Sequence, residues 1–119
     1  MIRIFQIVFT DEIVDAINSQ GHDGAVSQCP QYGVYLRNIR GADRYQPEDF
    51  RYYEPVAEVD TDQLFEAFTI SNGMGDESRY HVLPGARPRS LSVGDIVELN
   101  GQYHIVDVLG YKEISIGVG

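Results

Sequence analysis

Residues 88–114 read PRSLSVGDIVELNGQYHIVDVLGYKEI and contain the clearest local structure prediction in the chain. Two segments with alternating apolar residues, Gly94–Leu99 and Gln102–Val108, flank the pair Asn100-Gly101. This pair suits a two-residue type I′ turn, because both turn positions require positive φ. The stretch Pro88–Ile114 therefore predicts a carboxy-terminal β-hairpin.

The two-residue turn also sets the register of this hairpin. The expected opposite pairs are Leu99 with Gln102, Glu98 with Tyr103, Val97 with His104, and Ile96 with Ile105. One face of the hairpin then holds Ile96, Tyr103 and Ile105, and the other holds Val97 and Val106. If the first face is core, truncating Ile96 or Ile105 to alanine should cost about 2–5 kcal/mol.

The amino-terminal residues Ile2–Phe9 predict an interior strand, because apolar side chains fall on both of its faces. One face has Phe5, Ile7 and Phe9, and the other has Ile2, Ile4 and Val8. Thr10 is placed to cap a following helix, whose first turn holds Asp11 and Glu12. The apolar stripe of this helix is Ile13, Val14 and Ile17, and Gly21–Gly24 is expected to end it.

The segment Val26–Ile39 fits two structures. Pro30 suits the first turn of a short helix with Tyr32, Tyr35, Leu36 and Ile39 on one stripe. The run Gly33–Leu36 would equally suit a strand. The helical spacing fits better than alternation, so a short helix is favoured.

The middle of the chain predicts a strand and a second helix. After a polar loop over Gly41–Arg51, which ends in a turn at Gln46–Asp49, Tyr52–Val59 forms the strand, and Pro55 indicates an edge position or a bulge. Asp60 and Gln63 have capping-box spacing, and the expected helix stripe is Leu64, Phe65, Ala67 and Phe68. Asn72–Gly75 should stop this helix, and a short strand is possible at Arg79–Leu83.

These elements predict a single domain over residues 1–119 of the α+β class. We expect one small mixed or mainly antiparallel sheet with two packed helices and the carboxy-terminal β-hairpin.

Composition limits the partners and the compartment. The formal charge of −9 disfavours direct binding to nucleic acid or to an anionic membrane. No apolar run is long enough to span a bilayer, and the opening MIRIFQIVF resembles a first strand more than a signal peptide. The single cysteine, Cys29, cannot form an internal disulfide. A cytoplasmic protein is therefore expected.

The residues that could perform chemistry show no recognisable spacing. His22, His81, His104 and Cys29 are the only soft metal ligands, and they form no C-x-x-C or H-x-x-x-H pattern. The glycines at Gly21/Gly24 and Gly73–Gly75 follow expected helices, where they favour helix termination over a phosphate-binding loop. We therefore predict no catalytic residue, no cofactor and no metal site.

The same carboxy-terminal stretch resembles the YodL-like domain family. The matching opening residues are Arg89, Ser90, Leu91, Ser92, Val93, Asp95, Ile96 and Val97, and the matching tail residues are Gly110, Tyr111, Glu113 and Ile114. RIFQIVFTDEIVDAINSQG and FRYYEPVAEVDTDQLFEAFTISNG resemble the family's earlier segments more loosely. The chain departs from the family pattern at Gly94 and in its Gly117–Gly119 tail.

The resemblance implies a small accessory protein of a phage, plasmid or conjugative element, similar to KfrB-like plasmid proteins. It transfers no catalytic residue. We therefore expect a non-enzymatic protein that binds another protein, with partner contacts sought beside the hairpin at Arg87, Arg89, Ser90, Tyr111 and Glu113.

Two alternatives to this function stay open from the sequence. The segment Asp43–Asp62 has seven carboxylates and two arginines, so it could mimic nucleic acid against a host DNA-binding or defence protein. A pocket between helix and sheet could instead bind a small molecule or support catalysis. The clustered tyrosines are expected mainly in core and rim packing, although tyrosine also suits interfaces; they are Tyr32, Tyr35, Tyr45, Tyr52 and Tyr53.

Overall fold

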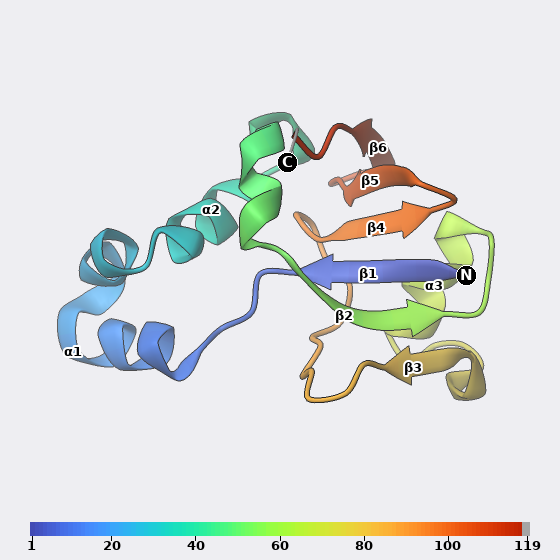
Figure 1. The fold of residues 1–119 in the computed structure, drawn as a ribbon, viewed down its shortest axis with the longest axis horizontal. Coiled ribbons are helices and arrows are strands. Elements are labelled where there is room, and N and C mark those ends of the chain that lie inside the picture. The colour runs from blue at the N-terminus through green and yellow to red at the C-terminus, as the bar shows by residue number, and fades with distance from the viewer. Residues whose placement is uncertain (118–119) are drawn as a thin grey trace.

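The computed structural model describes residues 1–117, which form one six-stranded sheet with helices around it (Figure 1). The strand order is β3-β2-β1-β4-β5-β6, and every pair of neighbours is antiparallel. The strands are β1 (Ile2–Gln6), β2 (Glu54–Val59), β3 (Tyr80–Val82), β4 (Ile96–Leu99), β5 (Gln102–Val106) and β6 (Tyr111–Ile114). The predicted α+β class with a mainly antiparallel sheet is confirmed.

β1 is the interior strand that its two apolar faces predict. Ile2 and Ile4 pack into a core on one side of the sheet, and Phe5 and Ile7 pack into a second core on the other side. The strand ends at Gln6 and not at Phe9, because the chain leaves the sheet there to reach the first helix.

β2 contains the bulge that Pro55 indicates. The pairing with β1 passes from Ile4 opposite Ala57 to Phe5 opposite Pro55, so one extra residue is accommodated in β2. The strand begins at Glu54, two residues later than predicted, and β3 covers its outer side at Ala57–Val59. The possible short strand at Arg79–Leu83 is confirmed as β3.

The hairpin of β4 and β5 has the predicted register, with Ile96 opposite Ile105 and Leu99 opposite Gln102. Asn100 and Gly101 have φ values of 53° and 82°, as a type I′ turn requires. The two faces are also as predicted, because Ile96, Tyr103 and Ile105 pack in one core and Val97 and Val106 in the other. The return strand ends at Val106, and a turn at residues 107–110 leads into β6, which the sequence did not predict.

Helices cover opposite faces of the sheet. α3 (Leu64–Ser71) lies behind the sheet in the view of Figure 1, and its Ala67 and Ile70 are buried. In front are η2 (Pro47–Tyr52) and the nearby end of α2 (Pro30–Asn38). The prediction of a polar loop over residues 41–51 is wrong, because this segment folds into the short 3-10 helices η1 (Ala42–Arg44) and η2. Phe50 of η2 packs on Phe5 with ring centroids 5.2 Å apart.

α1 (Asp11–Gln28) packs against α2 beside the sheet, and we call this pair the helical arm (Figure 1). The Thr10 hydroxyl caps α1 by accepting a hydrogen bond of 3.3 Å from the backbone N–H of Ile13. The predicted end of the first helical segment is confirmed at Gly21, whose φ of 76° and ψ of 179° are not helical. A second helical segment, which the sequence did not predict, follows directly and runs to Gln28. The arm has a small core of its own, formed by Ile13, Ala16, Ala25, Cys29 and Tyr32.

The start of α3 also differs from its prediction. The helix is capped at Gln63 without a side-chain hydrogen bond, so the expected capping box with Asp60 is absent from this helix start. Thr61 accepts a hydrogen bond from the Gln63 backbone N–H instead, and the Asp60 carboxylate pairs with His81 at 2.9 Å. Within residues 1–117, no helix combines the length and the apolar character that crossing a bilayer requires.

Candidate functional site

The structure separates the five predicted contact residues into two places. Arg87 and Arg89 lie in the connection between β3 and β4 and line a groove. Tyr111 lies at the start of β6 and lines a different hollow beside α3. Glu113 is exposed on β6, and Ser90 is exposed between Arg89 and Leu91. The five residues therefore do not form a single site.

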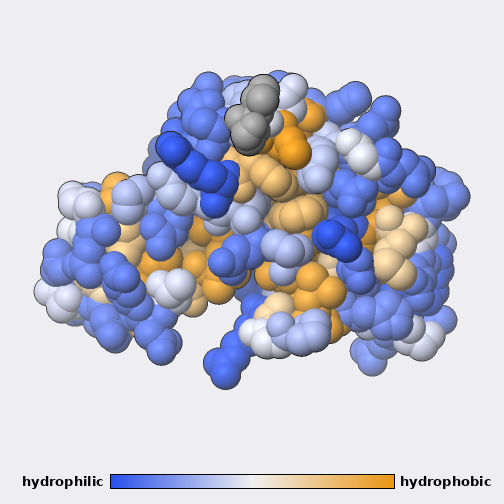
Figure 2. Space-filling view, in the orientation of Figure 1, coloured by the Kyte–Doolittle hydropathy of each residue, from blue (hydrophilic) through white to orange (hydrophobic). Residues whose placement is uncertain are grey.

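The first place is a groove of about 370 Å³, which we call the arginine groove. It lies where the segment that joins β1 to α1 passes β2 and the β3–β4 connection. Its lining residues are Val8, Phe9, Glu54, Pro55, Val56, Pro84, Gly85, Ala86, Arg87 and Arg89. In Figure 2 the surface is indented where the helical arm meets the body of the protein, at the lower edge of this face.

Arg89 is held firmly within the arginine groove. Its guanidinium donates a hydrogen bond of 2.9 Å to the carbonyl of Ile7. The guanidinium carbon also lies 4.7 Å from the ring centroid of Phe9 and 5.4 Å from that of Tyr35. Cation–π contact with two rings fixes the orientation of the charge.

A buried amide holds the backbone of Arg89, and the sequence reasoning missed it. Gln6 accepts a hydrogen bond from the Arg89 N–H and donates one to the Arg89 carbonyl, both at 3.0 Å. Its amide also donates to the Asp95 carboxylate at 3.0 Å. A polar residue on the strand face that also holds Ile2 and Ile4 is the signal that could have identified this role, since a buried amide requires partners.

Asp95 is a buried carboxylate beneath the groove. Its Oδ2 accepts hydrogen bonds from the Gln6 amide and from the Ser92 backbone N–H, both at 3.0 Å. Burial raises the pKa of Asp95 to about 6, and these two hydrogen bonds and the Arg89 charge oppose that rise only in part. The arrangement ties β4, β1 and the β3–β4 connection together.

Several residues of the stretch that resembles YodL-like domains make contacts that stabilise the fold. Leu91 is 1% exposed, and its backbone N–H donates to the Ser71 hydroxyl at 3.2 Å. Gly94, where the chain departs from the family pattern, has φ 93°. A Cβ at that position would lie 3.1 Å from the carbonyl atoms of Asn38, so this fold requires glycine there.

The second place is an exposed apolar surface beside α3, which we call the apolar patch: Phe65, Val108 and Leu109. These side chains are 80%, 69% and 91% exposed. Phe65 and Val108 line a hollow of about 200 Å³, and Leu109 follows Val108 in the chain. The other lining residues are Phe68, Val106, Asp107, Gly110 and Tyr111. The prediction that Phe65 packs inward is wrong, because the helix turns Leu64, Ala67 and Phe68 toward the core instead.

Tyr111 forms the inner wall of this hollow. Its hydroxyl donates a hydrogen bond of 2.9 Å to the carbonyl of Leu64, and burial raises its pKa to about 12. The side chain thus links β6 to the start of α3. Its role in the structure is to support the hollow, whereas the apolar patch provides the accessible surface.

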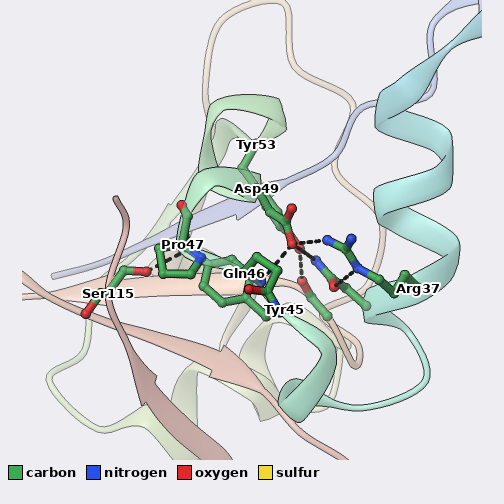
Figure 3. A network of polar contacts seen from close by, with 9 residues as sticks. Arg37, Tyr45, Gln46, Pro47, Asp49, Tyr53 and Ser115 are labelled. Atoms are coloured by element: carbon green, nitrogen blue, oxygen red, sulfur yellow. Dashed lines mark hydrogen bonds and ion pairs between the residues drawn. The ribbon is translucent and has the colours of Figure 1, made fainter. Parts of the chain in front are cut away.

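A polar network joins the helical arm to the body of the protein (Figure 3). The buried Asp49 carboxylate pairs with Arg37 of α2 and accepts a hydrogen bond of 2.9 Å from the Gln46 backbone N–H. Asn38 donates to Asp49 at 3.4 Å and to the Tyr53 hydroxyl at 3.1 Å. Tyr53 in turn donates to the Gly94 carbonyl, and burial raises its pKa. This network fixes α2 against η2 and β4.

Cys29 and His22, two of the candidate metal ligands, each have a hydrogen-bond partner within the helical arm. Cys29 is buried in the helical arm 3.5 Å from the Glu12 carboxylate, and burial raises its pKa. The His22 ring nitrogen bonds instead to the Tyr32 hydroxyl at 2.6 Å. In residues 1–117, no group of three or more histidine, cysteine, aspartate or glutamate side chains is placed to hold a metal ion.

Three of the seven carboxylates over residues 43–62, and most of the clustered tyrosines, have contacts within the protein. Asp49 and Glu58 pair with arginines, and the Asp60 carboxylate lies 2.9 Å from a ring nitrogen of His81. The other four, Asp43, Glu48, Glu54 and Asp62, are exposed. Tyr32, Tyr45 and Tyr53 are buried, and Tyr35 and Tyr52 are partly buried.

Comparison of the chain with models of protein families, with curated proteins and with solved structures finds no match. Membership of the YodL-like family therefore stays a prediction from the residues that resemble it.

Proposed function

We propose that this protein is a non-enzymatic accessory protein that acts by binding another protein through the apolar patch. The observation that supports this proposal is the exposure of Phe65 and Val108 at one apolar hollow, with the exposed Leu109 directly after Val108 in the chain. Large apolar side chains that gather on the surface of a soluble protein commonly mark an interface. An aromatic side chain near the centre of such a patch is a frequent source of binding energy.

The partner that this surface fits presents an apolar side chain of its own. The hollow of about 200 Å³ beside Phe65 has room for such a side chain, and its inner wall is formed by Phe68 and Tyr111. Contact of this kind depends on removing apolar area from water, and it should therefore persist at high ionic strength. A mobile-element origin and a cytoplasmic location complete the proposal, and both rest on the sequence alone.

The test replaces Phe65 by a photo-crosslinking phenylalanine analogue in cells and identifies the protein that is captured. The captured protein is then purified, and its affinity is measured for the wild type, for Leu109→Asp and for the control Val82→Asp. Val82 is also an exposed apolar residue, but it lies on β3, away from the patch.

We expect Leu109→Asp to weaken binding by about tenfold or more, which corresponds to about 1.4 kcal/mol, and Val82→Asp to leave it unchanged. The wild-type affinity should be retained when the salt concentration is raised. Equal loss with both variants would contradict the proposal, and so would crosslinks that form only to a second copy of this chain.

A further inference from the structure

The arginine groove concentrates positive charge on an acidic protein. Arg87 and Arg89 line it, and Arg51 lines an adjoining hollow of about 240 Å³ that shares Val8 and Glu54 with the groove. Glu54 is the one carboxylate among these lining residues. The local charge is thus positive, whereas the whole chain has a formal charge of −9.

These three arginines lack carboxylate partners within the part of the chain that the structure describes. The ion pairs among residues 1–117 involve Arg3, Arg37, Arg79 and His81. Arg51 stacks on Tyr52, with its guanidinium carbon 5.1 Å from the ring centroid. With 18 carboxylates available in the chain, three unpaired guanidinium groups along the groove and its adjoining hollow favour an external anion.

The floor of the groove is apolar and partly rigid. Val8, Pro55, Val56, Pro84 and Ala86 contribute apolar surface along the bulged start of β2. Arg89 is already fixed by the Ile7 carbonyl and by its two aromatic contacts, so little side-chain entropy is lost when it meets a carboxylate. Arg87, at the exposed end of the groove, can adjust to the position of a second carboxylate.

We infer that the arginine groove binds an extended acidic segment of a partner protein, in which carboxylates flank an apolar side chain. Charge complementarity selects the acidic residues, and the apolar floor selects the side chain between them. The volume of about 370 Å³ lies within the range of about 300–1,000 Å³ that is usual for ligand pockets. This second surface is separate from the apolar patch and does not depend on it.

The test selects, from a library of random peptides displayed on phage, those that bind the purified protein. The affinity of the selected peptides is then measured by fluorescence anisotropy. We expect the selected peptides to carry a carboxylate next to an apolar residue. In NMR spectra of the labelled protein, their addition should shift the amides of Val8, Val56 and Ala86. Binding should weaken as the salt concentration rises, because exposed charges are screened.

Arg87→Glu should weaken the binding of these peptides by about tenfold or more, and the control Arg44→Glu should change it by less than about twofold. Arg44 is exposed in η1 and does not line the groove. The amide spectrum of each variant verifies that it is folded.

Peptides that lack carboxylates, or binding that Arg87→Glu leaves unchanged, would overturn the inference. The inference would also be overturned if inorganic phosphate shifted these amides and the peptides did not, because the groove would then bind a small anion. A negative result here leaves the crosslinking test at Phe65 unaffected, so the two proposals can fail separately.

Discussion

At the scale of single residues, Asp95 makes the stability of this protein depend on pH. Its folded pKa is about 6, against an ordinary value of 3.8 in the unfolded chain. As the pH rises between these values, the unfolded chain loses the proton first, and the folded protein then binds more protons. The contribution of this group to stability is therefore largest at low pH and falls as the pH rises toward 6.

Asp95→Asn should remove this dependence, because the amide oxygen can still accept hydrogen bonds from Gln6 and Ser92 but cannot ionise. We expect the unfolding free energy of the wild type, relative to this variant, to fall by about 1–2 kcal/mol between pH 5 and pH 7.5. Urea unfolding at several pH values measures it. The range starts above the isoelectric point of about 4.5, where low net charge promotes precipitation.

Subtracting the unfolding free energy of Asp95→Asn from that of the wild type cancels the contribution of the other titrating groups. Several of those groups make stability change with pH in the opposite direction. Burial lifts the pKa of Asp95, whereas hydrogen bonds lower the pKa of Asp107 and of Asp76. If the difference in unfolding free energy between the wild type and Asp95→Asn stays constant or grows as the pH rises, the raised pKa of Asp95 is contradicted.

The site residues were only partly predictable, for reasons that lie in single side chains. Arg87 and Arg89 could be singled out from their position beside the hairpin, and the structure does place both in one groove. The position of Gln6 in the first strand indicates a buried amide that needs partners, but alternation in a strand gives the face of a side chain and does not show that Arg89 is the partner. Leu109 was not singled out, because its exposure depends on the turn at residues 107–110 that leads into β6, and the sequence did not predict β6.

At the scale of elements, the β4–β5 hairpin is the strongest test of packing. Ile105 is fully buried, lies opposite Ile96 and belongs to the same core as Phe5. Ile105→Ala should lower the unfolding free energy by about 2–5 kcal/mol, through lost burial and the cavity that remains. Thermal melting followed by circular dichroism, together with urea unfolding, measures the loss.

Leu109→Ala is the matched control for this substitution, since it removes a similar amount of apolar side chain three residues beyond β5. Its side chain is 91% exposed, so the unfolding free energy should change by no more than about 0.5 kcal/mol. Equal stability of Ile105→Ala and the wild type would mean that this face of the hairpin is not core.

The elements that the sequence predicted well are those set by local rules. Asn100-Gly101 requires one turn type, Thr10 has a hydroxyl where a helix needs an acceptor, and Pro30 suits a first helical turn. η2 and β6 were missed because their conformation depends on distant partners. Phe50 needs the ring of Phe5 and Tyr103, and β6 needs the edge of β5. The helix after Gly21 was missed because a glycine stop was expected to be final.

At the scale of the whole molecule, the helical arm and the sheet are joined by a polar network and by the packing of Tyr35 of α2 on Phe9 and Arg89. The arm has its own small core, and the molecule measures 41 Å along its longest axis and 27 Å along the other two. The network of Arg37, Asn38, Asp49 and Tyr53 lies at the junction (Figure 3). The arginine groove lies beside the same junction, along Val8 and Phe9, so the placement of the arm also sets the shape of the groove.

Asp49→Ala should loosen this junction without unfolding the sheet. The substitution leaves Arg37 and the Gln46 backbone N–H without their acceptor, which should lower the free energy of local opening by about 1–3 kcal/mol. Amides of α2 should then exchange with deuterium about tenfold to a hundredfold faster, whereas those of β1 and β4 keep their protection. The control Asp62→Ala removes an exposed carboxylate that accepts a hydrogen bond from the Gln63 side chain. It should leave the exchange rates of α2, β1 and β4 unchanged. If the exchange of α2 and β1 amides were accelerated equally, the prediction would be wrong. The helical arm and the sheet would then open together as one cooperative unit.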